Sequence, residues 1–150
     1  MPDYLFDSCA LIALFNDEEG ADIVSGLLDR TNRGEITAGI TAVNLIEVYY
    51  DRIRIAGIDR ANAIIHEIYS TFPLTVIESI GPDIVREAAR LKADGKMSFA
   101  DTILVATALY TGATLVTCDY IELKPVEQKE KIPFLWIRKQ HVVEDTEAYP

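Results

Sequence analysis

Short runs of apolar residues alternate with helical segments along this chain, and that alternation constrains the fold most strongly. Strands that are apolar throughout are typical of a parallel sheet covered by helices on both faces, whereas half-exposed strands alternate polar with apolar residues. The pattern therefore predicts a three-layer α/β/α fold around a mostly parallel five-stranded sheet. The expected strands are Tyr4–Phe6, Ile36–Ile40, Leu74–Ile77, Thr114–Thr117 and Phe134–Ile137.

The segments between these runs have helical spacing and recognisable start and stop signals. Ser8, Asp59 and Ser98 are the expected N-caps of three helices, and either Thr41 or Asn44 is the expected cap of a fourth. Glycines at 34, 57, 95 and 112 mark expected helix ends. The predicted helices span residues 8–16, 21–33, 41–55, 59–70, 82–94 and 98–110.

Length and composition indicate one ordinary domain over residues 1–150, with an acidic tail at about 140–150. The chain has 150 residues, of which 49% are apolar and 25% charged, and this mixture excludes a disordered chain. Its two cysteines are too few for a disulfide framework, and the N-terminus does not resemble a signal peptide. The longest uncharged stretch, residues 102–118, contains five threonines and a glycine and is shorter than a spanning helix. We therefore expect a cytoplasmic protein that makes no use of a membrane.

The chain is strongly acidic, with 14 Lys and Arg residues against 24 Asp and Glu residues and a net charge of −10. Such a surface repels phosphate backbones over a Debye length of roughly 8 Å at physiological salt. This charge excludes simple nucleic-acid binding by a basic face. A role on nucleic acid would need a local device that reverses the charge.

Two acids follow strands directly. Asp7 comes after the first expected strand and Asp119 after the fourth, and ligand sites of such sheets lie beyond the carboxyl ends of the strands. Acids also start loops and cap helices, so each residue alone favours that simpler explanation.

Glu47 and Asp101 interrupt apolar helices. Val43, Ile46 and Tyr50 are the helical neighbours of Glu47, so its carboxylate is expected on an apolar stripe, where an unpaired charge costs several kcal/mol. A distant Lys or Arg partner is the simpler explanation. Asp101 also fits an S-x-x-D capping pattern that begins at Ser98.

The four acids together indicate a metal site. If they converge, each close pair costs about 4 kcal/mol at an effective dielectric of 20. A divalent cation would neutralise the cluster. Oxygen ligands without His or Cys favour Mg²⁺ or Mn²⁺.

The chain resembles the PIN-domain ribonucleases, especially the small toxins of VapBC-type toxin–antitoxin pairs. Four pieces carry the resemblance over about 115 residues, in the order and spacing of that family. They are Leu5-Phe6-Asp7-Ser8, Ile40-Thr41 followed by Glu47, residues 98–108 beginning Ser98-Phe99-Ala100-Asp101, and Leu115-Val116-Thr117-Cys118-Asp119.

The resemblance implies a PIN-like sheet with a metal site formed by Asp7, Glu47, Asp101 and Asp119. Ser8 and Thr117 would support these catalytic acids. Many relatives carry a further acid two residues after the fourth, where this chain has Ile121, and Glu122 follows one position later.

The resemblance further implies a metal-dependent endoribonuclease that uses Mg²⁺ or Mn²⁺. Expected partners are an RNA substrate, an antitoxin with a basic C-terminal arm and a second copy of the chain. Two alternatives stay open. The chain could be a PIN-fold binding module without turnover, or a phosphate-transfer enzyme with Asp7 as nucleophile. The Asp7-Ser8-Cys9 sequence disfavours the second, because a haloacid-dehalogenase-like site has D-x-D there.

Overall fold

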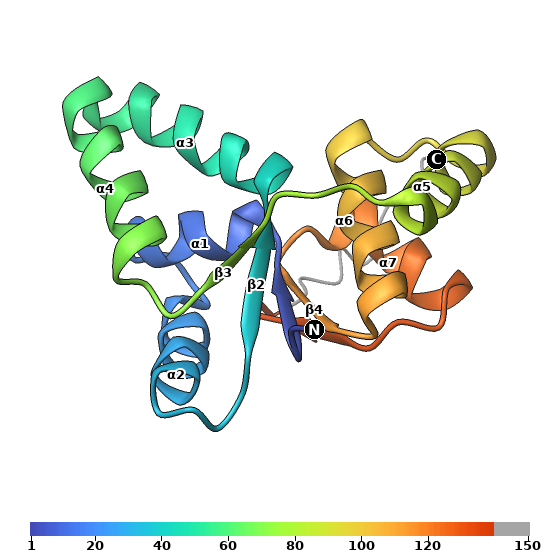
Figure 1. Ribbon diagram of the computed structural model, residues 1–150, viewed down its shortest axis with the longest axis horizontal. Coiled ribbons are helices and arrows are strands. Elements are labelled where there is room, and N and C mark those ends of the chain that lie inside the picture. The colour runs from blue at the N-terminus through green and yellow to red at the C-terminus, as the bar shows by residue number, and fades with distance from the viewer. Residues whose placement is uncertain (140–150) are drawn as a thin grey trace, which may run out of the picture.

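A computed structural model of the chain describes residues 1–139, and the expected acidic tail at 140–150 lies outside the described residues. The described part contains a five-stranded sheet, all parallel, with strand order β3-β2-β1-β4-β5 (Figure 1). The elements are β1 (Tyr4–Phe6), α1 (Ser8–Phe15), α2 (Ala21–Asn32), β2 (Ala38–Thr41), α3 (Ala42–Ala56), α4 (Ile58–Ser70), β3 (Thr75–Ile77), α5 (Pro82–Asp94), α6 (Phe99–Thr111), β4 (Thr114–Thr117), α7 (Tyr120–Lys129) and β5 (Phe134–Trp136). The predicted α/β/α fold with a five-stranded sheet is confirmed.

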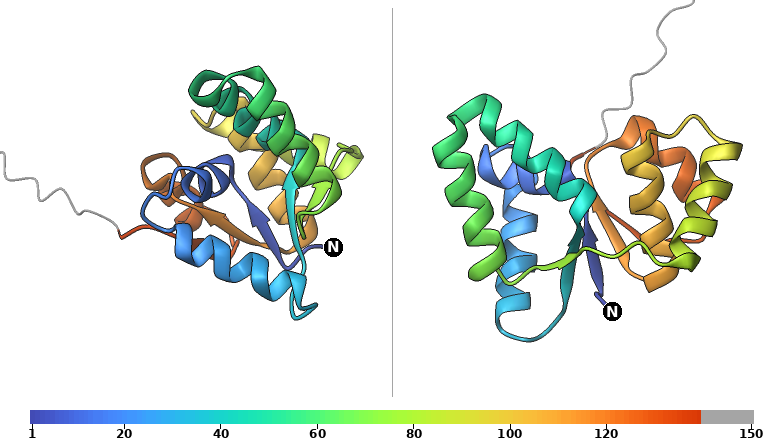
Figure 2. Two further views of the ribbon diagram at one scale, coloured as in Figure 1. Left: turned by 90° about the vertical axis from the view of Figure 1, so that its left-hand side faces the viewer. Right: turned by 45° about the horizontal axis from the view of Figure 1, so that its top comes forward.

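Helices cover both faces of the sheet. Helices α1 to α4 lie on one side and α5 to α7 on the other, as both further views show (Figure 2). The neighbouring residues Leu5 and Phe6 are both fully buried, and each belongs to a different core cluster. Strand β1 is therefore apolar throughout because each successive side chain enters a different core.

The order of the strands places a crevice beside β1. From β1 the chain winds outward through β2 and β3 on one side, and β4 and β5 lie on the other side. This reversal between β1 and β4 is a topological switch point, where open α/β sheets bind ligands beyond the carboxyl ends of their strands. Asp7 follows β1 and Asp119 follows β4, so both lie at this point.

Two expected N-caps are wrong by one or two residues. Asp7, not Ser8, caps α1, because its side chain accepts a hydrogen bond from the Ser8 backbone N–H. Gly57, not Asp59, precedes α4, which leaves Asp59 in the first turn. Gly57 ends α3 at a φ of +85° and so allows α4 to begin directly. Thr41 caps α3 and Ser98 caps α6, as expected.

The sequence analysis missed α7. This helix contains Pro125 and several charged residues, which together hide its pattern. Asp119 caps it by accepting a hydrogen bond from the Glu122 backbone N–H. The missed helix therefore orients two acids at once. None of the helices described for residues 1–139 is long and apolar enough to cross a membrane.

Candidate metal centre

Asp7 lies at the centre of the site and is buried, with 3% of its surface exposed. Its Oδ2 atom accepts a hydrogen bond from Thr117 Oγ1 at 2.8 Å. Its Oδ1 atom accepts from the Ser8 backbone N–H at 2.7 Å and from Asn44 Nδ2 at 3.3 Å. Residues from α1, α3 and β4 thus hold one carboxylate in place.

Asn44 joins Asp7 to Glu47. Its Nδ2 atom donates to Glu47 Oε1 at 3.1 Å as well as to Asp7 Oδ1, and its Oδ1 atom accepts from Thr41 Oγ1 at 2.7 Å. Ser8 Oγ makes a second bridge, at 3.3 Å from Asp7 Oδ1 and 3.4 Å from Glu47 Oε1. The amide of Asn44 is fully buried, so its orientation is set by these contacts.

Asp101, Asp119 and Glu122 form the tightest group of carboxylates in the described part of the chain. One oxygen from each lies within 4.8 Å of the others. Asp101 stands in the first turn of α6, where its backbone N–H donates to Ser98 Oγ at 3.2 Å. Thr117 Oγ1 accepts from the Asp119 backbone N–H at 3.1 Å and so connects this group to Asp7.

Burial and neighbouring charges raise the pKa values of three of the acids. Burial, followed by the charge of Asp7, raises the pKa of Asp101 to about 8. Burial also raises the pKa of Asp7, although the hydrogen bond from Thr117 lowers it in part. The pKa of Glu47 is raised by burial and then by the charge of Asp7. Burial and the neighbouring negative charges thus favour the protonated forms of Asp7, Glu47 and Asp101.

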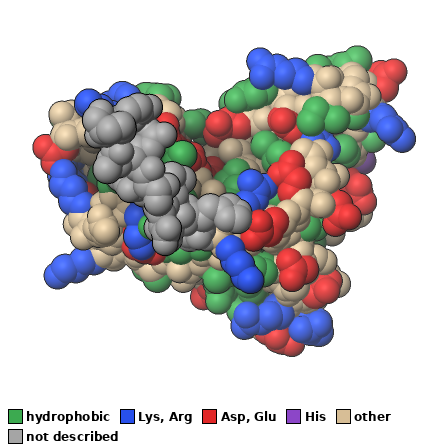
Figure 3. Space-filling model, turned by 180° about the vertical axis from the view of Figure 1, so that it is seen from behind, with side chains coloured by type: hydrophobic (Ala, Val, Ile, Leu, Met, Phe, Trp, Pro, Cys, Tyr) green, Lys and Arg blue, Asp and Glu red, His purple; other side chains and the backbone are tan. Residues whose placement is uncertain are grey.

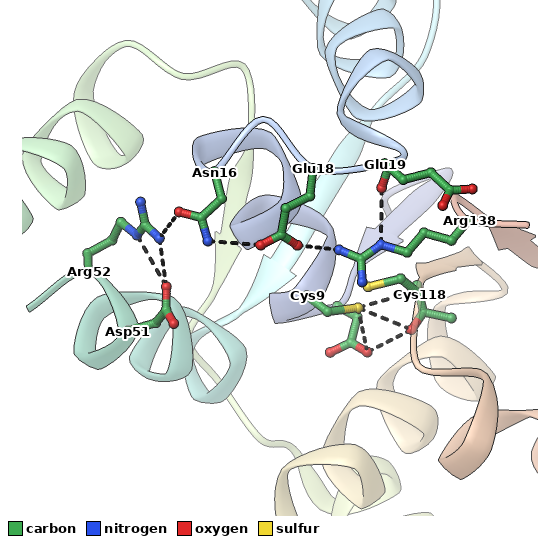
Figure 4. Close-up of polar contacts among 10 residues, drawn as sticks. Cys9, Asn16, Glu18, Glu19, Asp51, Arg52, Cys118 and Arg138 are labelled. Atoms are coloured by element: carbon green, nitrogen blue, oxygen red, sulfur yellow. Dashed lines mark hydrogen bonds and ion pairs between the residues drawn. The ribbon is translucent and has the colours of Figure 1, made fainter. Parts of the chain in front are cut away.

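No Lys or Arg forms an ion pair with these five acids within residues 1–139. Arg52, the basic residue nearest to Glu47 in sequence, turns toward Asp51 and Asn16, at 2.8 and 2.6 Å (Figure 4). Arg138 binds Glu18, which lies in the loop after α1 (Figure 4). The expected long-range salt bridge to Glu47 is therefore not found among these residues.

The apolar stripe around Glu47 does not face the core. Ile46 is 61% exposed and Tyr50 is 44% exposed, while the buried side of α3 carries Leu45 and Val48. Helix α3 is apolar on more than one face, so its pattern alone could not identify the buried one. Glu47 stands half-buried at the edge of the site.

Cys9 and Cys118 are half-buried free thiols. Cys9 points toward Cys118, whose backbone N–H donates to Cys9 Sγ at 3.0 Å (Figure 4). Cys9 Sγ also lies 3.6 Å from Asp7 Oδ2. Cys9 thus contacts both Asp7 and Cys118.

The donor set fits a hard divalent cation. Five carboxylates supply oxygen only, and three of them already approach within a shared coordination sphere. His66 is an exposed residue of α4 outside the site, and His141 lies outside the described residues. Mg²⁺ and Mn²⁺ suit such donors better than Zn²⁺ does.

Comparison with known proteins identifies the family. The family model described as the PIN domain matches residues 4–125, so the chain belongs to the PIN-domain family. No protein in a search of curated proteins matches it significantly.

Several solved structures share the fold. VapBC2 from Rickettsia felis, bound to a DNA fragment from its promoter, gives a TM-score of 0.70 at 15% identity, covering 90% of this chain and 98% of that one. DNA-bound VapBC from Salmonella typhimurium gives 0.67 at 16% identity, covering 92% and 100%. A toxin–antitoxin complex from Klebsiella pneumoniae gives 0.64 at 18% identity, covering 91% and 99%.

The structure brings together the four predicted acids and both predicted supports, and it adds two residues. Glu122, which the sequence left open, lies with Asp101 and Asp119. Asn44, expected only as a possible helix cap, binds two of the acids. A polar residue on the same helical face as Leu45 and Val48 was the available signal for Asn44.

Proposed function

We propose that this protein is a metal-dependent endoribonuclease that hydrolyses RNA phosphodiester bonds with Mg²⁺ or Mn²⁺. We further propose that it is the toxin of a toxin–antitoxin pair. One observation carries the proposal. Five carboxylates from four separate parts of the chain converge at the switch point of the sheet, without an ion pair to Lys or Arg in residues 1–139.

Asp101, Asp119 and Glu122 would hold the ion, with Asp7 completing the site. A bound divalent ion supplies a Lewis acid that lowers the pKa of water and stabilises charge on phosphate oxygens. Thr117, Ser8 and Asn44 would keep Asp7 and Glu47 in position by the hydrogen bonds described above. Glu47 is half-buried with a raised pKa, which suits it to accept a proton from the attacking water.

The proposed reaction adds one water across a P–O bond. The water oxygen bonds to phosphorus, the P–O3′ bond breaks, and the products carry a 5′-phosphate and a 3′-hydroxyl. The 3′ oxygen takes its proton from water, because the site offers no histidine among residues 1–139.

Charge limits how RNA can approach. On the face shown in Figure 3, Lys and Arg side chains are scattered among Asp and Glu side chains rather than gathered into one basic surface. RNA would therefore be held mainly at the site, where a cation reverses the local charge. We propose a cytoplasmic location for the protein, in keeping with an RNA substrate.

The proposed protein partner is an antitoxin whose basic arm enters the same carboxylate cluster. An arginine can form paired hydrogen bonds with carboxylates and so compete with the metal. A second copy of the chain is the other proposed partner. Ile46 and Tyr50, exposed apolar residues of α3, are candidates for contact with either. Light scattering of the purified protein, alone and with a basic peptide, tests both associations.

A cleavage assay tests the enzymatic proposal. The protein is incubated with structured and single-stranded RNAs in Mg²⁺, in Mn²⁺ or in chelator, and product ends are mapped. We expect 5′-phosphate products only with metal, and none from Asp7→Asn or Asp101→Asn. Asp59→Asn, which removes an exposed acid from α4, is the matched control and should cleave normally. Cleavage that persists in both site variants would refute the proposal. Tight peptide capture without turnover would instead support a binding module.

A further inference from the structure

A cavity of about 390 Å³ lies between α5 and α7, next to the carboxylate site. We call it the α5–α7 pocket. Glu122 belongs to its lining and also to the group formed with Asp101 and Asp119. A ligand in the pocket therefore lies beside the proposed metal ligands. Leu91, Met97, Pro125 and Val126 supply apolar surface to the lining.

The charges around the pocket largely cancel. Asp94 pairs with Lys129 at 3.3 Å, and Glu130 pairs with Arg90 at 3.0 Å. One acid, Glu122, and one base, Lys96, remain without an ion pair among the described residues of the lining. A nearly neutral pocket with apolar walls favours an uncharged group over a phosphate or a guanidinium.

The carboxylate of Glu122 in the lining is a hydrogen-bond acceptor. Pro125 has no N–H, so the carbonyl of Ile121, one turn earlier in α7, lacks its usual helical partner. The loop after α5 is held in place because Lys92 Nζ donates to the Met97 carbonyl at 2.5 Å. A flat apolar group with N–H donors on its edge matches this combination.

We propose that the α5–α7 pocket binds a nucleobase of the RNA strand whose phosphate lies at the carboxylate site. The inference rests on the proposed ribonuclease function and extends it to a base-binding subsite. The ribose and phosphate would remain outside the pocket, near the metal and Lys96.

Gly95 provides a sharp test. It lines the pocket, its φ of −135° is extended backbone that any residue adopts, and an added Cβ would make ordinary contacts with the Leu91 carbonyl at 3.4 Å and the Met97 backbone N at 3.9 Å. Gly95→Leu should therefore fold and fill part of the cavity. Gly26→Leu is the matched control, because Gly26 has open space on α2, far from α5 and α7 in the fold.

The first measurement is binding without metal, by NMR titration in chelator with AMP, CMP, GMP, UMP and ribose 5-phosphate. We expect nucleotides to shift the resonances of Met97 and neighbouring residues, and ribose 5-phosphate to leave them unchanged. Gly95→Leu should weaken nucleotide binding at least ten-fold, and Gly26→Leu should not. Should Gly95→Leu fail to fold, Ile121→Ala, at a side chain 88% exposed, should still weaken binding at least three-fold.

Equal binding by ribose 5-phosphate, or equal nucleotide binding by wild type and Gly95→Leu, would overturn the inference. The inference would also be overturned if Gly95→Leu bound nucleotides normally but no longer bound an arginine-rich peptide. The cavity would then be a peptide site. The second measurement is RNA cleavage, where we expect Gly95→Leu to raise KM about ten-fold. If wild type and Gly95→Leu cut RNA equally well, the pocket inference fails while the proposed function stands. If no RNA is cut under any condition, the proposed function fails, and nucleotide titration still decides the pocket.

Discussion

Thr117 Oγ1 donates a hydrogen bond of 2.8 Å to Asp7 Oδ2, across 110 residues of sequence. The same oxygen accepts from the Asp119 backbone N–H. One buried hydroxyl therefore fixes the distance between the loops that follow β1 and β4. These loops meet because the two strands are adjacent and parallel in the sheet.

Removing this hydroxyl should destabilise the protein. Thr117→Val keeps the shape of the side chain but removes the hydroxyl that donates to Asp7 Oδ2 and accepts from the Asp119 backbone N–H, at a cost of about 1–3 kcal/mol. Urea unfolding measures this cost. Thr107→Val is the control, since that buried hydroxyl bonds only to the Ile103 carbonyl of its own helix, and its loss should cost less than about 1 kcal/mol. Equal costs at both positions would contradict the special role of Thr117.

Asn44 should support metal binding without being a ligand. Asn44→Ala removes the amide that donates to both Asp7 and Glu47, and loss of such a supporting contact typically lowers metal affinity about 10–100-fold. Calorimetric titration with Mn²⁺ measures this change. Asn62→Ala, at an exposed position on α4, should leave affinity unchanged. Unchanged affinity in Asn44→Ala would show that Asp7 and Glu47 hold their positions without the amide.

The metal-free protein should lose stability as the pH rises. The pKa of Asp101 is about 8 in the folded state, against an ordinary value of 3.8, so the folded protein retains a proton that the unfolded chain releases. Unfolding free energy therefore falls between about pH 4 and pH 8. Thermal unfolding in chelator at pH 6 and pH 8, compared with Asp101→Asn, isolates this contribution. If the stability of wild type falls no more steeply between pH 6 and pH 8 than that of Asp101→Asn, the raised pKa of Asp101 is contradicted.

Asp101→Asn should separate stability from activity. At pH 8 without metal, the amide removes repulsion from Asp7 and Asp119, so the variant should exceed wild type by at least about 1.4 kcal/mol, the equivalent of one pKa unit. The same change removes a proposed ligand. Adding Mg²⁺ or Mn²⁺ should raise the Tm of wild type but not that of the variant. A variant that is less stable than wild type in chelator would argue that Asp101 is held by a contact other than carboxylate repulsion.

The sequence by itself determined the class of the fold, the order of the described elements except α7, and four candidate acids, three of them at strand or helix ends. Apolar strands, capping residues and glycine stops are local signals, and Asp7, Asp119 and Asp101 stand beside such signals. These residues could be found without knowing their distant neighbours.

Only the tertiary structure decided which side chains meet. The hydrogen bond of Thr117 to Asp7, the amide of Asn44 between Asp7 and Glu47, and the approach of Glu122 to Asp101 all join residues far apart or on a helix whose pattern was ambiguous. The sequence did not predict helix α7, because Pro125 and several charged residues obscure its helical pattern. The position of Glu122 was therefore not predicted either. Strand order sets these contacts, and strand order depends on the packing of the whole sheet rather than on any local run of residues.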